Sequence, residues 1–277
     1  MKKTKFSSGL SSSPYLVWMV IFIVLPLFVV LYYAFTDYNT GEFTFTNIAE
    51  LFNSNYLPVI IKSIWLALLA AVVCLIIGYP VAYCIAKASP TAQKILLMLI
   101  MLPMCMSFLL RTLAWVSLLR DTGIINSLLG VFGIEPLPLI RTSSAVVLGM
   151  VYNYLPYMIL PLHSVMSKMD NRLVEAAQDL GCNGVQVFRR VTLPLSLPGI
   201  ISGFTMVFVP AVSTFYISKK LGPTDMVLIG DVIEAQFKTA YNPNLGAAMS
   251  LLLMVIILVC VGVMNRVSGI NEEDMVG

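Results

Sequence analysis

Long runs of apolar residues, free of charge or nearly so, alternate with shorter polar segments along the chain. A helix of about 20 apolar residues crosses the roughly 30 Å hydrocarbon core of a bilayer and satisfies its own backbone hydrogen bonds there. Six runs are long enough, at residues 15–35, 64–86, 95–119, 143–165, 193–218 and within 239–265. The pattern therefore predicts an all-α, polytopic membrane protein with six transmembrane helices.

The first run follows Lys2, Lys3 and Lys5, as the apolar region of a signal peptide would. It is longer than the roughly 7–15 apolar residues of a signal peptide, and no A-x-A cleavage site follows. We expect it to be a retained span. Close helix packing is expected at Gly199 and Gly203, which form a GxxxG motif in the fifth run.

Composition agrees with a chain that uses lipid as its solvent. Hydrophobic residues make up 58%, charged residues only 11%, and the mean hydropathy is +0.89, whereas ordinary globular domains carry about 25% charged residues. The net charge of +3 is scattered, which argues against a nucleic-acid partner. No glycine precedes a lysine, so the phosphate loop of ATPases is absent, and His163 is the single histidine, so we predict neither a metal site nor an enzyme.

The distribution of basic residues predicts the orientation. If both termini are cytoplasmic, ten basic residues lie inside and six outside, which agrees with the positive-inside rule. We therefore expect a cytoplasmic tail at 1–14, a six-span domain at 15–265 and a second cytoplasmic tail at 266–277.

The segment 166–192, between the fourth and fifth runs, has the pattern of a short amphipathic helix. Asp170 or Asn171 is suited to cap its start, and Gly181 to end it in a left-handed turn. Its apolar stripe consists of Leu173, Val174, Ala177 and Leu180. Physics alone leaves two interpretations open, a helix resting on lipid headgroups and a docking element for a cytoplasmic partner.

The same segment resembles the EAA loop of ABC importer permeases. That family's pattern is EAA, three residues, Gly, nine residues and I-x-L-P; here it reads Glu175-Ala176-Ala177, then Gly181, then Val191-x-Leu193-Pro194, with Val191 in place of Ile. The resemblance implies a type I ABC importer permease fold and a helix that docks on the ATP-binding subunit. The residues implied in this coupling are Glu175, Ala176, Ala177, Asp179, Leu180 and Gly181.

Residues 151–162, 210–216 and 228–237 resemble the polyamine importer permeases, and the last two resemble the B-type subunit of spermidine/putrescine importers. This resemblance implies polyamine transport across a bacterial plasma membrane. The implied partners are two ATP-binding subunits, a second, C-type permease subunit, an extracytoplasmic polyamine-binding protein and membrane lipid. The chain itself is expected to bind no cofactor, since ATP and Mg²⁺ belong to the partner subunits.

Aromatic and acidic residues near the ends of the spans are candidates for the substrate path, because aromatic faces attract ammonium groups. The candidates are Tyr152, Tyr154, Tyr157, Phe215, Tyr216 and Asp231. An ordinary aromatic belt and a solvated outer loop are the alternative interpretations. Arg111 is the single charge inside a predicted span. Three interpretations are open: Arg111 lines the substrate path, it forms a structural pair with another residue, or its side chain snorkels to the interface.

Three other functions remain alternatives. An ion-coupled secondary transporter commonly carries acidic residues inside its spans, and all 14 acidic residues here lie outside the six runs. An intramembrane enzyme would need catalytic residues within its spans. With no acidic residue in the six runs and a single histidine, this chain lacks most of the combinations that such an enzyme uses. An ABC importer permease for another small solute fits the EAA loop equally well.

Overall fold

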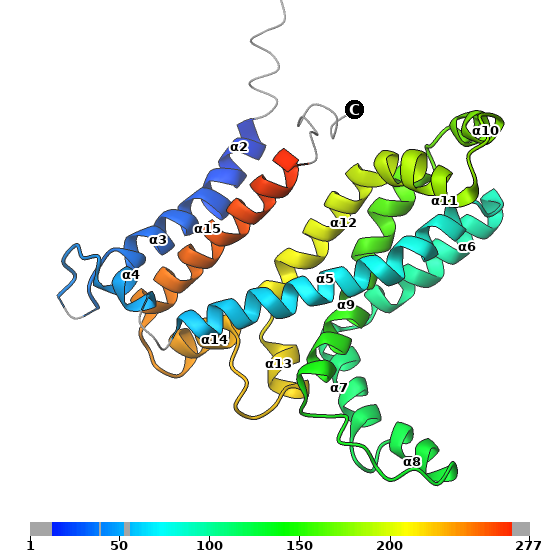
Figure 1. The fold of residues 1–277 in the computed structure, drawn as a ribbon. Helices are drawn as coiled ribbons and strands as arrows, with labels where there is room; N and C mark the ends of the chain where they lie inside the picture. The colour runs from blue at the N-terminus through cyan, green and yellow to red at the C-terminus, as the bar shows by residue number, and fades with distance from the viewer. Residues whose placement is uncertain (1–12, 39, 53–55, 268–277) are drawn as a thin grey trace, which may run out of the picture. The chain divides into compact units, whose positions relative to one another are not determined.

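The structure is a computed structural model that describes residues 13–38, 40–52 and 56–267 (Figure 1). Lys2, Lys3 and Lys5, and all but two residues of each expected terminal tail, lie outside these ranges. Within these ranges the regular secondary structure is helical, apart from an isolated antiparallel bridge between Thr36 and Phe43, and loops and turns connect the helices.

Five helices in the described ranges have the length and apolar composition of membrane spans. They are Pro14–Ala34, Leu57–Ala86, Ser143–Met166, Gly184–Val212 and Pro243–Arg266. A sixth candidate is a bent pair, Pro90–Cys105 with Phe108–Val131. The predicted all-α, multi-span fold is therefore confirmed. The third predicted span is not one continuous helix but this bent pair.

The third predicted span, 95–119, is broken near its middle. Helix α6 (Pro90–Met101) tightens into a 3₁₀ turn, η2 (Leu102–Cys105), and α7 (Phe108–Leu119) follows. The segment Phe108–Val131, which begins with α7, is bent by 89° from Pro90–Cys105. Pro103 has no backbone N–H to continue the helix, and Met106 adopts an extended conformation with ψ of 149°. The two halves therefore point in different directions, which hydropathy alone does not reveal.

The fifth predicted span also ends earlier than expected. Helix α12 (Leu193–Val212) stops before Ser213, and a separate helix, α13 (Tyr216–Leu221), follows. The Ser213 hydroxyl donates to the carbonyl of Val209 at 3.2 Å, and such local bonds compete with helix continuation. At its start, α12 continues from α11 (Gly184–Val187) through a π-helical turn, η3 (Phe188–Thr192).

The chain divides into two compact units. The first comprises the described residues up to Pro58 together with 232–256. It contains α2 (Ser13–Met19), η1 (Val20–Val24), α3 (Leu25–Ala34), α4 (Thr46–Leu51), most of α14 (Ile229–Lys238) and the first part of α15 (Pro243–Val267). Figure 1 shows α3 and α15 side by side, and their contact buries Ala34, Leu245 and Ala248.

Two buried asparagines hold the end of α3 within this first unit. The side-chain amide of Asn47 donates to the carbonyls of Ala34 and Thr36, at 3.3 and 2.8 Å. The amide of Asn244 also donates to the Thr36 carbonyl, at 2.6 Å. These bonds satisfy carbonyls that a helix end leaves without intrahelical partners.

The second unit comprises 59–231 and the described residues after 256. Its helices are α5 (Leu57–Ala86), α6, α7, α8 (Ile124–Val131), α9 (Ser143–Met166), α10 (Asn171–Asp179), α11, α12 and α13. Figure 1 shows α10 and α8 at opposite ends of this unit.

The close contact between α9 and α12 forms at the GxxxG motif. A Cβ atom at Gly199 would lie 3.2 Å from the Cα of Leu162, and one at Gly203 only 2.8 Å from the sulfur of Met158. The absence of side chains at both positions lets the two backbones approach, as small residues do in membrane helix pairs. The predicted close packing is confirmed.

Candidate functional site

Helix α10 and the turn that follows it form a short, well-capped element. The Asp170 carboxylate accepts a hydrogen bond from the backbone N–H of Arg172 at 3.0 Å. At the other end Gly181 has φ of +83°. Its N–H donates to the carbonyl of Gln178 at 2.8 Å, and that of Cys182 donates to Ala177 at 3.1 Å. These two bonds form a Schellman motif, so the predicted helix start and glycine stop are confirmed.

A second cap begins the helical stretch that leads into α12. The side chains and backbones of Asn183 and Gln186 exchange two hydrogen bonds of 2.9 Å each, which is a capping box. Helix α11 begins immediately afterwards, at Gly184. Caps on both sides of Gly181 therefore hold α10 at a defined angle to the chain that follows it.

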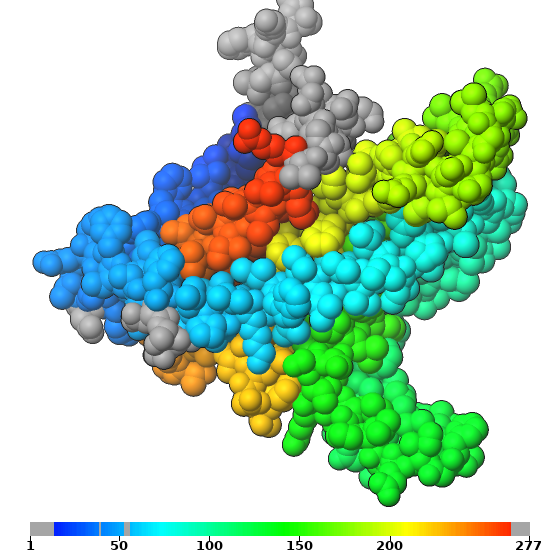
Figure 2. Space-filling model, viewed as in Figure 1, coloured from blue at the N-terminus to red at the C-terminus, as the bar shows by residue number. Residues whose placement is uncertain are grey.

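The residues that the EAA resemblance singles out lie on the surface of the unit. Glu175, Ala176, Asp179, Leu180 and Gly181 are exposed. Ala177 is half-buried, and no residue of α10 is buried. The Leu180 side chain is 85% exposed, and Figure 2 shows α10, in yellow-green, at the surface. An exposed apolar stripe on a rigid short helix has the chemistry of a docking element and none of a catalytic centre.

The candidate aromatic residues of the path pack on different neighbours. The ring of Tyr152 stands edge-on to Trp115, with centroids 5.4 Å apart, and Tyr157 is tilted against Tyr154 at 6.4 Å. Phe215 is exposed, immediately before α13.

Tyr216 lies near both an aromatic ring and an ammonium group. Its ring centroid is 6.1 Å from that of Phe108, and the Nζ atom of Lys220 lies 5.9 Å from the same centroid. This distance is within the range of cation–π attraction. The face of Tyr216 is therefore placed where an ammonium group can reach it.

Asp231 is not a solvated loop residue. It is 5% exposed, and its Oδ2 atom accepts hydrogen bonds from the Ser218 hydroxyl at 2.8 Å and the Leu228 N–H at 2.9 Å. These bonds join α13 to the start of α14, so the carboxylate organises this part of the chain. Leu228 is only three residues before Asp231, whereas Ser218 is 13 residues away, and no local signal in the sequence indicates the contact with Ser218.

Arg111 is buried among protein atoms in α7, with 9% of its surface exposed. Within the described ranges, its Nε and Nη1 atoms have no hydrogen-bond partner. The structural pairing considered from the sequence is therefore not found for these two atoms.

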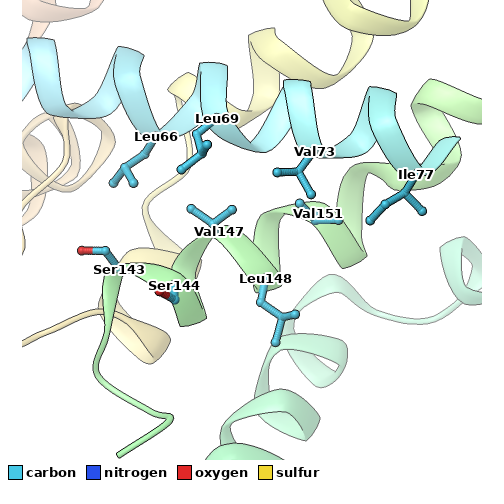
Figure 3. Close-up of a pocket in the computed structure, with 9 residues that line it drawn as sticks. All are labelled: Leu66, Leu69, Val73, Ile77, Ser143, Ser144, Val147, Leu148 and Val151. Atoms are coloured by element: carbon cyan, nitrogen blue, oxygen red, sulfur yellow. The ribbon is translucent and has the colours of Figure 1, made fainter. Parts of the chain in front are cut away.

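An apolar groove of roughly 350 Å³ lies between α5 and α9 (Figure 3). Side chains of Leu66, Leu69, Val73 and Ile77 on α5 face Val147 and Val151 on α9, and the polar groups are those of Ser143 and Ser144 at one end. Such a lining suits hydrocarbon. It offers no carboxylate or aromatic face to an ammonium group, so it does not have the chemistry of a polyamine path.

Sequence reasoning missed a basic hollow of roughly 1040 Å³ at the α13 end of the second unit. Its walls include Arg120, Arg141, Lys219 and Lys220. Three segments far apart in sequence supply these residues, which is why no linear motif indicates them.

Comparison with known proteins identifies the family. Residues 75–270 match the family of binding-protein-dependent transport system inner membrane components. The chain belongs to this family. It is thus the membrane-spanning permease component of an ABC importer, a multi-pass inner-membrane protein and not an enzyme, and nucleotide is bound by separate ATPase subunits.

Individual relatives agree with this family. The chain is 38% identical over 256 residues to the spermidine/putrescine transport system permease protein PotB of Haemophilus influenzae, covering 90% of each chain. It is 35% identical over 246 residues to PotB of Escherichia coli K12, covering 86% of this chain and 90% of the relative. A solved bacterial alginate ABC transporter, in complex with an alginate pentasaccharide-bound periplasmic protein, shares the fold. Its TM-score is 0.80 at 17% identity, covering 95% of this chain and 94% of that one.

Proposed function

We propose that this chain is the B-type permease subunit of an ATP-driven polyamine importer and that it translocates spermidine and putrescine. The observation that carries the proposal is 38% identity, over 90% of both chains, to a permease named for spermidine/putrescine transport. A second such permease, at 35% identity, supports it. Its partners are a C-type permease subunit, two ATP-binding subunits and an extracytoplasmic binding protein that delivers the polyamine.

Helix α10 docks on one ATP-binding subunit and transmits its closure to the spans. The support is an exposed helix whose direction is held by caps at Asp170 and Asn183. The Schellman turn at Gly181 adds to this rigidity. A rigid link moves the spans as its docking surface moves, whereas a flexible one would absorb the motion.

Both termini lie in the cytoplasm, together with the coupling segment 166–192. The support is the excess of basic residues on that side of the six-span domain 15–265. Arg189 and Arg190, next to the start of α12, are exposed and suit the cytoplasmic membrane surface.

The aromatic residues along α9 and next to α13 guide the ammonium groups of the polyamine. Phe215 and Tyr216 are the principal candidates, with Tyr152 and Tyr157 on α9. The support is the Lys220 ammonium, 5.9 Å from the centre of the Tyr216 ring. Asp231 contributes by holding α13 and α14 together rather than by meeting the substrate at the surface.

The test is ATP-dependent uptake of radiolabelled spermidine and putrescine into proteoliposomes that contain the whole complex and its binding protein. A cation–π contact of about 1 kcal/mol corresponds to roughly a fivefold effect. We therefore expect Phe215→Ala and Tyr216→Ala to lower uptake about fivefold each, while Tyr216→Phe retains it. Phe132→Ala, at an 80% exposed ring beyond α8, is the matched control and should transport normally.

Two results would contradict the proposal. Wild-type vesicles that accumulate another solute and leave polyamines outside would refute the substrate. Normal polyamine uptake by both alanine variants would refute the role of the aromatic residues and leave the substrate assignment standing.

A further inference from the structure

The coupling segment 166–192 ends in a π-helical turn. This turn, η3, joins α11 to α12, and α10 packs on both α11 and η3. Pro194, the second residue of α12, has no backbone N–H, and in a regular α-helix its ring would clash with the carbonyl of Arg190. A wide turn just before the proline relieves this conflict, and π-helical turns are frequent at functional sites. The geometry of η3 therefore sets the direction of α10 and α11 relative to α12.

The side chain of Tyr79, on α5, contacts the chain on both sides of this turn. Its ring stands edge-on to that of Phe188, the first residue of η3, with centroids 5.6 Å apart and planes at 82°. Its hydroxyl oxygen lies 3.0 Å from that of Ser196, in the first turn of α12. One tyrosine, in a contact that we call the Tyr79 clamp, therefore spans the whole π-helical turn.

The hydrogen bond of the clamp has a defined direction. The Ser196 hydroxyl donates its single proton to the carbonyl of Leu193 at 2.9 Å, so Tyr79 is the donor and Ser196 the acceptor. Ser196 is fully buried and Tyr79 is half-buried. A hydrogen bond shielded from water in this way is electrostatically stronger than an exposed one. Phenylalanine at position 79 would keep the ring contact and remove the donor.

The part of α5 that carries Tyr79 is held against the neighbouring spans. A Cβ atom at Gly78 would lie 3.0 Å from the Cγ atom of Met158, so α5 approaches α9 closely next to Tyr79. The fully buried Met158 also contacts α12 at Gly203. Three spans thus meet around one methionine, and the Tyr79 clamp joins this packed centre to η3.

The π-helical turn itself is covered by little of the protein. Thr192 is buried at its end, whereas its first three residues, 188–190, are exposed. Helices kink readily at such turns. The Tyr79 clamp therefore acts where a loss of stiffness would let α10 and α11 move without moving α12.

We propose that Tyr79 is a positioning residue for coupling, which holds the π-helical turn so that motion of α10 reaches α5 and α12 together. This inference rests on the proposed function for the docking of α10 on the ATP-binding subunit. Without the clamp, α10 still docks and ATP is still hydrolysed. Bending of η3 then absorbs part of the motion, as a flexible hinge does, and fewer substrate molecules cross for each ATP.

The test compares ATP hydrolysis with polyamine uptake in proteoliposomes that contain the whole complex and its binding protein. Tyr79→Phe keeps the ring and removes the donor, Tyr79→Ala removes both, and Ser196→Ala removes the acceptor. Tyr83→Phe is the matched control. It removes a tyrosine hydroxyl one turn further along α5, from a ring that lies under the Lys87 ammonium at 4.4 Å.

We expect the number of ATP molecules hydrolysed per imported polyamine to rise about fivefold in Tyr79→Phe, the factor that corresponds to one ordinary hydrogen bond. Tyr79→Ala should raise it at least about tenfold, because the aromatic contact is lost as well. Ser196→Ala should resemble Tyr79→Phe, and the double variant should be no worse, since both changes remove the same bond. Tyr83→Phe should keep the wild-type ratio. The ATP-binding subunit should co-purify with every variant.

A second measurement follows the motion itself. Spin labels at Arg172 on α10 and Ile76 on α5, both exposed, report the distance between the two helices in a cysteine-free background. In the otherwise wild-type protein this distance should stay the same when ATP binds, because the clamp makes both helices move together. In Tyr79→Ala it should change on ATP binding, and its distribution should broaden.

A wild-type ratio of hydrolysis to uptake in Tyr79→Ala would overturn the proposal. An equal fall in hydrolysis and uptake, at an unchanged ratio and an unchanged distance, would also overturn it, because Tyr79 would then only stabilise the fold. The proposed function fails in a different way, through wild-type vesicles that import no polyamine. The distance measurement needs no substrate, so it tests the Tyr79 clamp even in that case.

Discussion

The left-handed turn at Gly181 offers the most direct test of how α10 works. Gly181 has φ of +83°, and a Cβ atom added there would meet no other atom within 4 Å. Replacing it with alanine therefore adds backbone strain and no steric clash. The left-handed conformation costs a residue with a Cβ about 1–2 kcal/mol, and each 1.4 kcal/mol is about tenfold in an equilibrium.

Gly181→Ala should thus reduce the population of the native turn relative to its alternatives by roughly 5- to 30-fold. If α10 docks on the ATP-binding subunit, the affinity for that subunit falls by up to the same factor, because the misdirected helix end misplaces the docking surface. Gly184→Ala is the matched control: its Cβ also meets nothing within 4 Å, and its φ lies outside the left-handed region. Gly181→Asn should be intermediate, since asparagine tolerates this conformation.

Two measurements separate structure from function. Hydrogen exchange at the amides of Gly181 and Cys182, which donate the Schellman bonds, reports the turn itself. Binding of the purified ATP-binding subunit to the reconstituted permease pair, followed by ATPase activity and uptake, reports coupling. Faster exchange with unchanged binding and uptake would refute the docking role of α10 and favour a helix that rests on the membrane. Unchanged exchange would refute the strain argument.

Two further predictions concern packing and orientation. Gly203→Val should destabilise the contact between α9 and α12 by about 1–3 kcal/mol, because its Cβ would lie 2.8 Å from the sulfur of Met158. Thermal unfolding in detergent should show a lower midpoint for this variant than for the wild type. The midpoint of Gly262→Ala, whose Cβ meets nothing within 4 Å, should be unchanged. In a cysteine-free background, a cysteine at Asp225 should react with an impermeant thiol reagent in intact cells, and one at Lys87 should react only after permeabilisation. The reverse labelling pattern would place the termini outside.

Local features of the sequence determined the elements of this protein. Hydropathy over about 20 residues located the spans, because lipid demands a continuous apolar surface and internally bonded backbone. The start of α10 and its glycine stop were also predictable, since a cap involves residues only a few positions apart. The contact at Gly199 and Gly203 followed from the spacing of small residues on one helix face.

Tertiary structure decided what lies at the ends of these elements. The break between α6 and α7 depends on the backbone angles at Met106, which the apolar run conceals. Asp231 reads as a solvated loop acid, yet a bond to Ser218, 13 residues away, buries it. The basic hollow is the clearest case. Arg120 and Arg141 are ordinary loop residues in the sequence, and in the structure they line one hollow. The buried side chain of Asn126 bonds to the carbonyls of Arg120 and Leu137, and so joins the two segments that carry them.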